Sequence, residues 1–158
     1  MSRVQLALNV DDLDASIEFY TKLFGTPPAK VRKDYANFAV ADPPLKLVLI
    51  AGQGEPGTLN HVGVEVASTD EVAAAAARMT AVGVASEMQE ATTCCFAVQD
   101  KVWVTGPEIA WEIYTVLADA PVMHPEGDCC CTPAGEIPSA NVDAEPVGVG
   151  AAPRISCC

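Results

Sequence analysis

The chain contains the same order of secondary-structure signals twice, and this internal repeat restricts its fold more than any other feature. Alternating apolar and polar residues predict strands, and apolar residues at helical spacing predict helices. In the first half the predicted segments are a strand at 3–10, a helix at 13–24 and strands at 35–40 and 45–50. In the second half they are a strand at 61–66, a helix at 71–81 that Asp70 is expected to cap, and strands at 92–98, 101–104 and 110–116.

The two halves align with only a small length difference. Placing Gln5 on His61 needs a shift of 56 residues, whereas placing the turn at 42–43 on the turn at 106–107 needs a shift of 64 residues. We interpret the chain as two strand-helix-strand-strand-strand units, an arrangement of the α+β class.

Strand alternation predicts which side chains share a face of the sheet. The valines and leucines of strands 3–10 and 61–66 should pack against the helices, while the opposite faces combine Gln5 with Ala7 and His61 with Gly63. Glu112 lies in a strand otherwise suited to burial, where an unpaired carboxylate would be costly. Alignment of the turns makes Val48 the counterpart of Glu112, so Gln5, His61 and Glu112 occupy repeat-related positions.

Each of these three residues has an ordinary structural explanation when taken alone. Gln5 could be a hydrogen-bonding strand residue, His61 a half-exposed strand histidine, and Glu112 an ion-pair partner of Lys101 or Arg3. Taken together they offer an amide oxygen, an imidazole nitrogen and a carboxylate at matched positions. This set predicts a metal site with open positions, similar to the facial triad of non-heme Fe(II) oxygenases with glutamine in place of one histidine.

Two adjacent cysteines, Cys94 and Cys95, form a second candidate site. A free cysteine is often a small buried apolar residue. Neighbouring thiolates can also close on one soft ion, but two consecutive residues of a regular strand face opposite sides of the sheet. Joint binding therefore requires that Cys94 and Cys95 leave strand geometry in a loop or bulge.

The last forty residues, 119–158, differ in character from the rest. They contain six of the twelve prolines and few large apolar residues, which predicts a disordered tail. Five further cysteines fall in this tail and could capture or store a soft ion: Cys129, Cys130, Cys131, Cys157 and Cys158.

Charge and hydropathy exclude several classes of partner. The formal net charge of −12 offers no basic surface for nucleic acid, and no apolar run approaches the ~20 residues of a membrane span. The N-terminus leads directly into a strand without an apolar signal region. We therefore expect a cytoplasmic protein whose cysteines are reduced.

Several segments resemble the ArsI/CadI family of the vicinal oxygen chelate superfamily, which contains glyoxalases and extradiol dioxygenases. The resemblance covers about residues 1–118, and its most specific pieces are Thr-Thr-Cys-Cys at 92–95 and Asn-His-Val-Gly-Val-Glu at 60–65. The other matching segments lie at 3–10, 35–38, 42–50 and 99–104. The chain departs from the family pattern in the turn at 105–111 and at Phe96, where a tyrosine is expected.

The resemblance implies a fold and a site. It implies an open sheet built from modules at about 1–52 and 59–118, followed by the cysteine-rich tail at 119–158. It implies that Gln5, His61 and Glu112 bind Fe(II) and are the catalytic set. It further implies that Cys94 and Cys95 bind the substrate arsenic.

The resemblance also implies a reaction, which is the O₂-dependent cleavage of the carbon–arsenic bond of trivalent organoarsenicals such as methylarsenite, giving arsenite. The partner would be a small organoarsenical or a soft metal ion, in the context of arsenic and heavy-metal resistance, and the superfamily also allows a homodimer. Two other functions stay open: a non-catalytic, metal-induced binder of cadmium or arsenite, and a glyoxalase-like isomerase. The isomerase is disfavoured because it has no use for a thiol pair.

Overall fold

The structure, a computed structural model that describes residues 2–124, contains the predicted repeat. The first module comprises β1 (Arg3–Val10), α1 (Leu13–Phe24), β2 (Lys30–Arg32), β3 (Tyr35–Val40) and β4 (Leu45–Ala51). The second comprises β5 (Leu59–Glu65), α2 (Thr69–Ala81), β6 (Ser86–Cys94), β7 (Ala97–Thr105) and β8 (Ala110–Asp119). The predicted fold class of two βαβββ modules is confirmed. The tail beyond residue 124 lies outside the described residues, and the domain boundary at 118 stays a prediction.

All the strands form one eight-stranded sheet in the order β2-β3-β4-β1-β5-β8-β7-β6. Within each module the first strand pairs in parallel with the last, and the antiparallel pair β1–β5 joins the modules. The register confirms the alignment made from sequence, because Ala7 lies opposite Val48 and Gly63 lies opposite Glu112. These two pairs are equivalent in the repeat.

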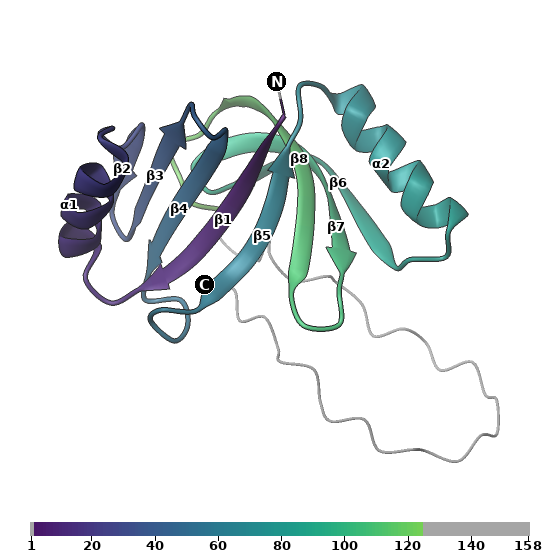
Figure 1. The fold of residues 1–158 in the computed structure, drawn as a ribbon. Coiled ribbons are helices and arrows are strands. Elements are labelled where there is room, and N and C mark those ends of the chain that lie inside the picture. The colour runs from purple at the N-terminus through teal and green to yellow at the C-terminus, as the bar shows by residue number, and fades with distance from the viewer. Residues whose placement is uncertain (1, 125–158) are drawn as a thin grey trace, which may run out of the picture.

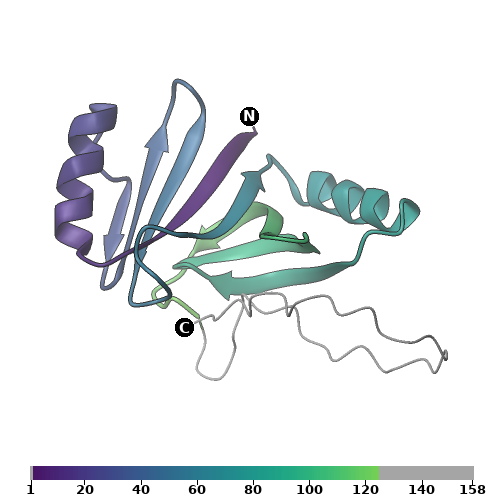
Figure 2. The same cartoon turned by 60° about the horizontal axis from the view of Figure 1, so that its bottom comes forward.

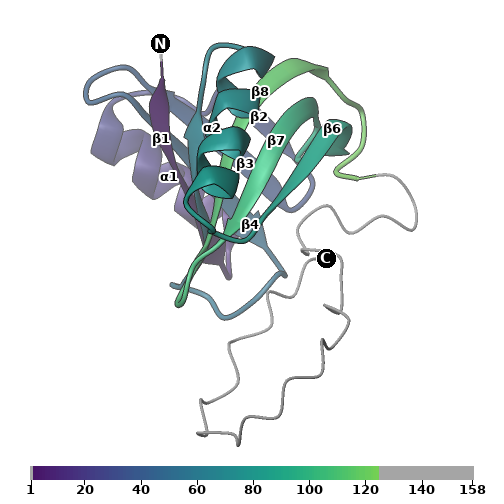
Figure 3. The same cartoon turned by 90° about the vertical axis from the view of Figure 1, so that its right-hand side faces the viewer.

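The two helices cover opposite ends of the sheet (Figure 1). Apolar residues of α1, including Tyr20 and Phe24, pack against a buried cluster on β3 and β4 that contains Phe38 and Leu49. On α2, Val72 and Ala75 pack against Val102 of β7, so that the helix lies across β7 and its neighbours (Figure 3). Leu6, Leu8 and Val10 lie in the cluster with α1, and Val66 lies in the cluster with α2, as predicted for these residues.

Local details of the second module differ from the sequence-based expectation. Helix α2 begins at Thr69 and is capped by Ser68, whose side chain accepts a hydrogen bond from the Glu71 amide; the predicted cap at Asp70 is therefore wrong. The predicted strand at 92–98 is two strands, β6 and β7, joined at Cys95 and Phe96. The sequence did not indicate this turn, because neither Cys95 nor Phe96 is a glycine or proline that would mark it.

The sheet is strongly twisted, and the strands of the two modules run in clearly different directions (Figure 2). The curl brings the turn between β6 and β7 to the edge strand of the other module. Lys30 of β2 donates a hydrogen bond to the Phe96 carbonyl over 3.0 Å and forms an ion pair with Asp119 at 2.6 Å. Phe96 also packs against Tyr35 with ring centroids 5.4 Å apart. The curl makes the face opposite the helices concave, and these contacts link the two modules across it.

No helix within residues 2–124 combines the length and the apolar character that crossing a bilayer requires.

Candidate active site

The three predicted metal ligands meet on the concave face, each from a different strand. Gln5, His61 and Glu112 come from β1, β5 and β8, which are neighbours in the sheet, and each is at most 4% exposed. Gln5 Nε2 lies 3.1 Å from His61 Nε2 and 2.6 Å from Glu112 Oε1, and the last two atoms are 3.3 Å apart. The prediction that these residues converge is thus matched by the geometry.

The spacing of these atoms fits a divalent metal ion. Ligand atoms at right angles, about 2.1 Å from one metal, lie about 3 Å from one another. His61 Nε2, Glu112 Oε1 and the Gln5 amide nitrogen, whose place the amide oxygen takes when the amide turns by half a revolution, are 2.6–3.3 Å apart. Within residues 2–124 no group of three or more His, Cys, Asp and Glu side chains could hold a metal ion, so the Gln5 amide is needed to complete a set of three ligands.

Gly63 makes room for this arrangement. It lies between Gln5 and Glu112 in one row across the sheet. A Cβ atom at this position would lie 2.9 Å from Glu112 Cγ and 3.4 Å from Gln5 Cβ. Sequence alternation identified Gly63 only as a small neighbour of His61, whereas the register shows that it separates Gln5 from Glu112.

We expect Gly63→Ala to lower the free energy of unfolding by about 1–3 kcal/mol and to weaken divalent-metal binding, because the new methyl group displaces Glu112. Denaturant unfolding and titration with Co(II) would measure the two effects. The double variant Gly63→Ala/Glu112→Ala should lose less unfolding free energy than the sum of the losses in the two single variants, because the Glu112 Cγ atom that the new methyl group would meet is absent. Strict additivity would show that Gly63 does not act through Glu112.

A chain of hydrogen bonds orients His61 for metal binding. The Thr58 hydroxyl donates its hydrogen to the Glu55 carbonyl, so it accepts a hydrogen bond from Asn9 Nδ2. The other atom of that amide, Asn9 Oδ1, then accepts from Asn60 Nδ2 over 3.0 Å. Asn60 Nδ2 also donates to the Gln53 carbonyl, so Asn60 Oδ1 faces His61 Nδ1 at 2.8 Å. His61 Nδ1 therefore carries the hydrogen and Nε2 presents its lone pair to Gln5 and Glu112, as a metal-binding histidine requires.

Glu112 is held as a carboxylate by a buried lysine. Lys101 Nζ lies 3.1 Å from Glu112 Oε2, which leaves Oε1 facing Gln5 and His61. Burial raises the pKa of the Glu112 carboxyl, but the positive charge of Lys101 lowers it, and the net shift is downward from 4.5. Stability from the ionised group is thus present above about pH 4.5 and lost as the pH falls through the lowered pKa. The sequence suggested Lys101 only as an alternative partner for Glu112.

The two cysteines lie where the hairpin between β6 and β7 turns. Cys94 pairs with Ala97, so Cys95 and Phe96 form a two-residue turn with φ angles of 56° and 59°. Positive φ at both positions is typical of a type I′ turn and is strained for residues other than glycine, asparagine and aspartate. The turn brings the two Sγ atoms within 3.2 Å. The condition for joint binding, departure from strand geometry, is therefore met.

The thiol pair lies beside the metal-ligand set. Cys94 packs with Trp103 and Ala110, and the Trp103 ring stands edge-on to the His61 ring with centroids 5.4 Å apart. The hydrogen bond with Cys94 and burial raise the pKa of the Cys95 thiol. Of the two charged residues nearby, Lys101 opposes this pKa shift and Glu112 adds to it. Trp103 thus links the thiol pair to His61 of the predicted ligand set.

The predicted accessory thiols Cys129, Cys130, Cys131, Cys157 and Cys158 lie outside the described residues. Phe96, where a tyrosine was expected, is 9% exposed and anchors the hairpin against Tyr35. The altered turn before β8 leaves Glu112 opposite Gly63, so this departure from the family pattern does not displace the ligand.

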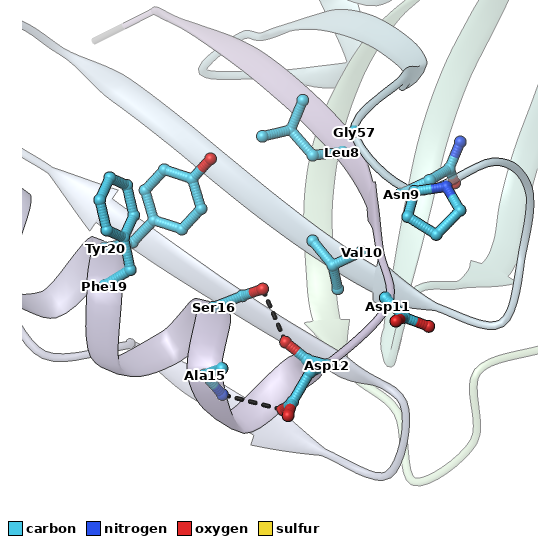
Figure 4. A pocket seen from close by; sticks show the side chains of 11 residues that line it. Leu8, Asn9, Val10, Asp11, Asp12, Ala15, Ser16, Phe19, Tyr20 and Gly57 are labelled. Atoms are coloured by element: carbon cyan, nitrogen blue, oxygen red, sulfur yellow. Dashed lines mark hydrogen bonds between the residues drawn. The ribbon is translucent and has the colours of Figure 1, made fainter.

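A separate pocket of about 420 Å³ lies where α1 begins and contains none of the predicted site residues (Figure 4). Two of its polar residues serve the start of the helix. Asp12 Oδ1 accepts from the Ala15 amide over 2.9 Å, and Ser16 Oγ donates to the Asp12 carbonyl over 2.7 Å. These are the capping interactions of the helix.

Comparisons with known proteins agree with this geometry. Residues 3–109 match the model of the Glyoxalase/Bleomycin resistance protein/Dioxygenase superfamily. The chain is 64% identical over 121 residues to cadmium-induced protein CadI of Mycobacterium tuberculosis, an alignment covering 76% of this chain and 80% of CadI. It is 60% identical over 136 residues to the trivalent organoarsenical cleaving enzyme of Thermomonospora curvata, covering 84% of this chain and 90% of that enzyme.

Among solved structures, the Mn(II)-bound glyoxalase from Novosphingobium aromaticivorans shares the fold with a TM-score of 0.56 and 18% identity. That match covers 76% of this chain and 42% of the glyoxalase. At this identity the likeness concerns the fold alone. The two close relatives and the superfamily match confirm the resemblance noted from sequence: the chain belongs to the Glyoxalase/Bleomycin resistance protein/Dioxygenase superfamily and, within it, to the ArsI/CadI family.

Proposed function

We propose that this protein cleaves the carbon–arsenic bond of trivalent organoarsenicals, with Fe(II) and O₂, and releases arsenite. The observation that carries the proposal is the thiol pair, with Sγ atoms 3.2 Å apart, next to an amide, an imidazole and a carboxylate on one concave face. The name of the relative that is 60% identical, a trivalent organoarsenical cleaving enzyme, supports both the substrate class and the prediction that this chain is an enzyme.

Substrate capture follows from the chemistry of the two thiols. A trivalent organoarsenical with two hydroxyl groups can exchange both for sulfur, forming two As–S bonds and releasing two water molecules. The thiol hydrogens leave with the hydroxyl groups, so the raised pKa of Cys95 does not prevent the exchange. Because the arsenic is then attached at two points, its organic substituent has a restricted direction. Such positioning lowers the entropic part of the barrier.

Gln5, His61 and Glu112 are the residues that would hold Fe(II). The metal, when bound, supplies the activation of O₂ that the reaction needs. The balance for the methyl compound is methylarsonous acid and O₂ giving arsenous acid and formaldehyde, in which the C–As bond breaks and carbon is oxidised by four electrons. Arsenic remains trivalent, so no other reductant or oxidant is required.

Other residues of the concave face shape the surroundings of the reacting atoms. Tyr35, Phe96 and Trp103 are at most 9% exposed and form aromatic walls beside the thiols. Lys101, which is fully buried, keeps Glu112 ionised. These residues limit the access of bulk water to the bound substrate. The cytoplasm, where thiols stay reduced, is the compartment that suits this chemistry.

Purified protein under reducing conditions should release arsenite and formaldehyde from methylarsonous acid when Fe(II) and air are both present. Arsenic speciation and a formaldehyde assay measure the two products. Omission of Fe(II) or of O₂ is the control and should stop both. Tight arsenical binding with no product under iron-loaded, aerobic conditions would replace the proposal with the alternative, a cadmium- or arsenite-binding protein.

A further inference from the structure

The Gln5 amide makes hydrogen bonds to His61 and Glu112 that could not persist if a metal ion were bound between these residues. Its nitrogen points into the site and donates hydrogen bonds to Glu112 Oε1 over 2.6 Å and to His61 Nε2 over 3.1 Å. The His61 Nε2 atom accepts, because its Nδ1 hydrogen is directed to Asn60. The two N–H groups of the Gln5 amide thus donate to His61 Nε2 and Glu112 Oε1, the same two atoms that a metal ion would bind.

A metal ion binds a glutamine side chain through its oxygen, since the amide nitrogen has no available lone pair. Gln5 must therefore turn its amide by about half a revolution when a metal enters. This turn moves the nitrogen to the place where the oxygen now lies. In the present structure that oxygen accepts a hydrogen bond from the Tyr114 hydroxyl over 2.6 Å, so Tyr114 decides whether the turned amide has a partner.

The Tyr114 hydroxyl can meet either orientation of the amide. It lies 2.6 Å from Gln5 Oε1 and 3.0 Å from Glu65 Oε2, but it carries only one hydrogen. With the nitrogen of Gln5 facing the metal site, the two oxygens compete for that hydrogen. After the turn, Gln5 donates to the tyrosine oxygen and Tyr114 donates to Glu65, so both contacts become hydrogen bonds.

Glu65 is fixed where this exchange requires it. Arg3 contacts both of its carboxylate oxygens, at 2.9 and 3.1 Å, and Lys46 lies 3.3 Å from Oε2. Arg3 and Glu65 also face each other across the β1–β5 pair. The acceptor for the tyrosine hydrogen is therefore present whether or not a metal is bound.

We propose that Tyr114 is a positioning residue that lets Gln5 present its amide oxygen to the metal, by transferring its hydrogen bond from Gln5 to Glu65. The inference rests on the metal site of the proposed function. It assigns a role to a side chain that touches neither the substrate thiols nor the metal, and it predicts that the tyrosine hydroxyl contributes to metal affinity only when residue 5 is an amide.

The test uses Co(II) as a spectroscopic probe of the metal site in the full chain. We expect Tyr114→Phe to weaken Co(II) binding about tenfold, because the turned amide loses its acceptor; this is the low end of the range for partners of metal ligands. In the Gln5→Glu background the same substitution should change affinity less than twofold, since a carboxylate presents an oxygen in either orientation. Visible absorption of bound Co(II) gives the affinity and reports the ligand set.

Tyr20→Phe is the matched control, because it also removes a tyrosine hydroxyl, one on α1 in the cluster on the helix side of the sheet. Its Co(II) affinity should equal that of the wild type, and thermal unfolding of each metal-free variant shows that it is folded. Equal Co(II) affinities of wild type and Tyr114→Phe, or an equal loss in both backgrounds, would overturn the role of Tyr114 while leaving the metal site intact. No Co(II) binding by the wild type would overturn both.

Discussion

Glu112→Ala is expected to reduce the turnover of methylarsonous acid roughly a thousandfold or more, which corresponds to about 4 kcal/mol in the activation free energy. The substitution removes the only carboxylate among the three proposed ligands, so metal affinity falls with turnover. Arsenical binding should be nearly unchanged, because the thiol pair lies on a different hairpin. Arsenite release, Co(II) titration and arsenical titration of the metal-free protein separate these effects.

Loss of Glu112 also removes the carboxylate that buried Lys101 faces, and breaking a buried ion pair can cost about 3–5 kcal/mol of stability. Glu112→Gln is therefore the second variant, since its amide oxygen can still accept from Lys101 while the charge is gone. It should fold, bind the arsenical and turn over slowly. Wild-type turnover in either folded variant would remove Glu112 from the catalytic set.

Cys94→Ser should have the opposite pattern, with arsenical affinity reduced at least about a hundredfold and Co(II) affinity unchanged. Trivalent arsenic held by two sulfurs gains from the second attachment as any bivalent ligand does, and losing one attachment removes that gain. The serine keeps the size and the turn, so the hairpin should be preserved. Titration with an arsenical and with Co(II), followed by single-turnover kinetics, would measure the division of roles.

The matched control for the thiols is Cys157→Ser, which breaks an adjacent cysteine pair outside the described part of the chain. Turnover at saturating substrate should stay at the wild-type value. Equal losses from Cys94→Ser and Cys157→Ser would mean that any pair of neighbouring thiols suffices. In that case the geometry of the hairpin would have no special part in substrate binding.

The fold followed from the sequence because the repeat is recorded in local patterns. The shifts of 56 and 64 residues align Gln5 with His61 and Val48 with Glu112, and the observed register pairs Ala7 with Val48 and Gly63 with Glu112. Strand alternation then placed Gln5 and His61 on the face opposite the valines and leucines, and the repeat added Glu112. Alternation depends only on the two-residue period of a strand, so the face on which a strand side chain lies can be predicted without the tertiary structure.

The cysteine pair shows where local patterns fail. The run at 92–98 contains no glycine or proline, and its composition predicts one strand, yet the chain reverses at Cys95 and Phe96 with φ angles of 56° and 59°. Contacts from the other module stabilise this turn: Lys30 binds the Phe96 carbonyl and Tyr35 packs on its ring. Lys30 and Tyr35 are each more than sixty residues from Phe96 in sequence, so no local sequence pattern includes both the turn and its partners.

By itself the sequence determined the two modules, the matched positions of Gln5, His61 and Glu112 and the adjacency of the two cysteines, because each depends on spacing along the chain. The tertiary structure alone decided that Gly63 leaves room between Gln5 and Glu112, that Asn60 orients His61, and that Tyr114 stands between Gln5 and Glu65. The physical reason is that a hydrogen bond depends on the direction of a single N–H or O–H group. That direction is set by side chains that approach one another only when the sheet has formed.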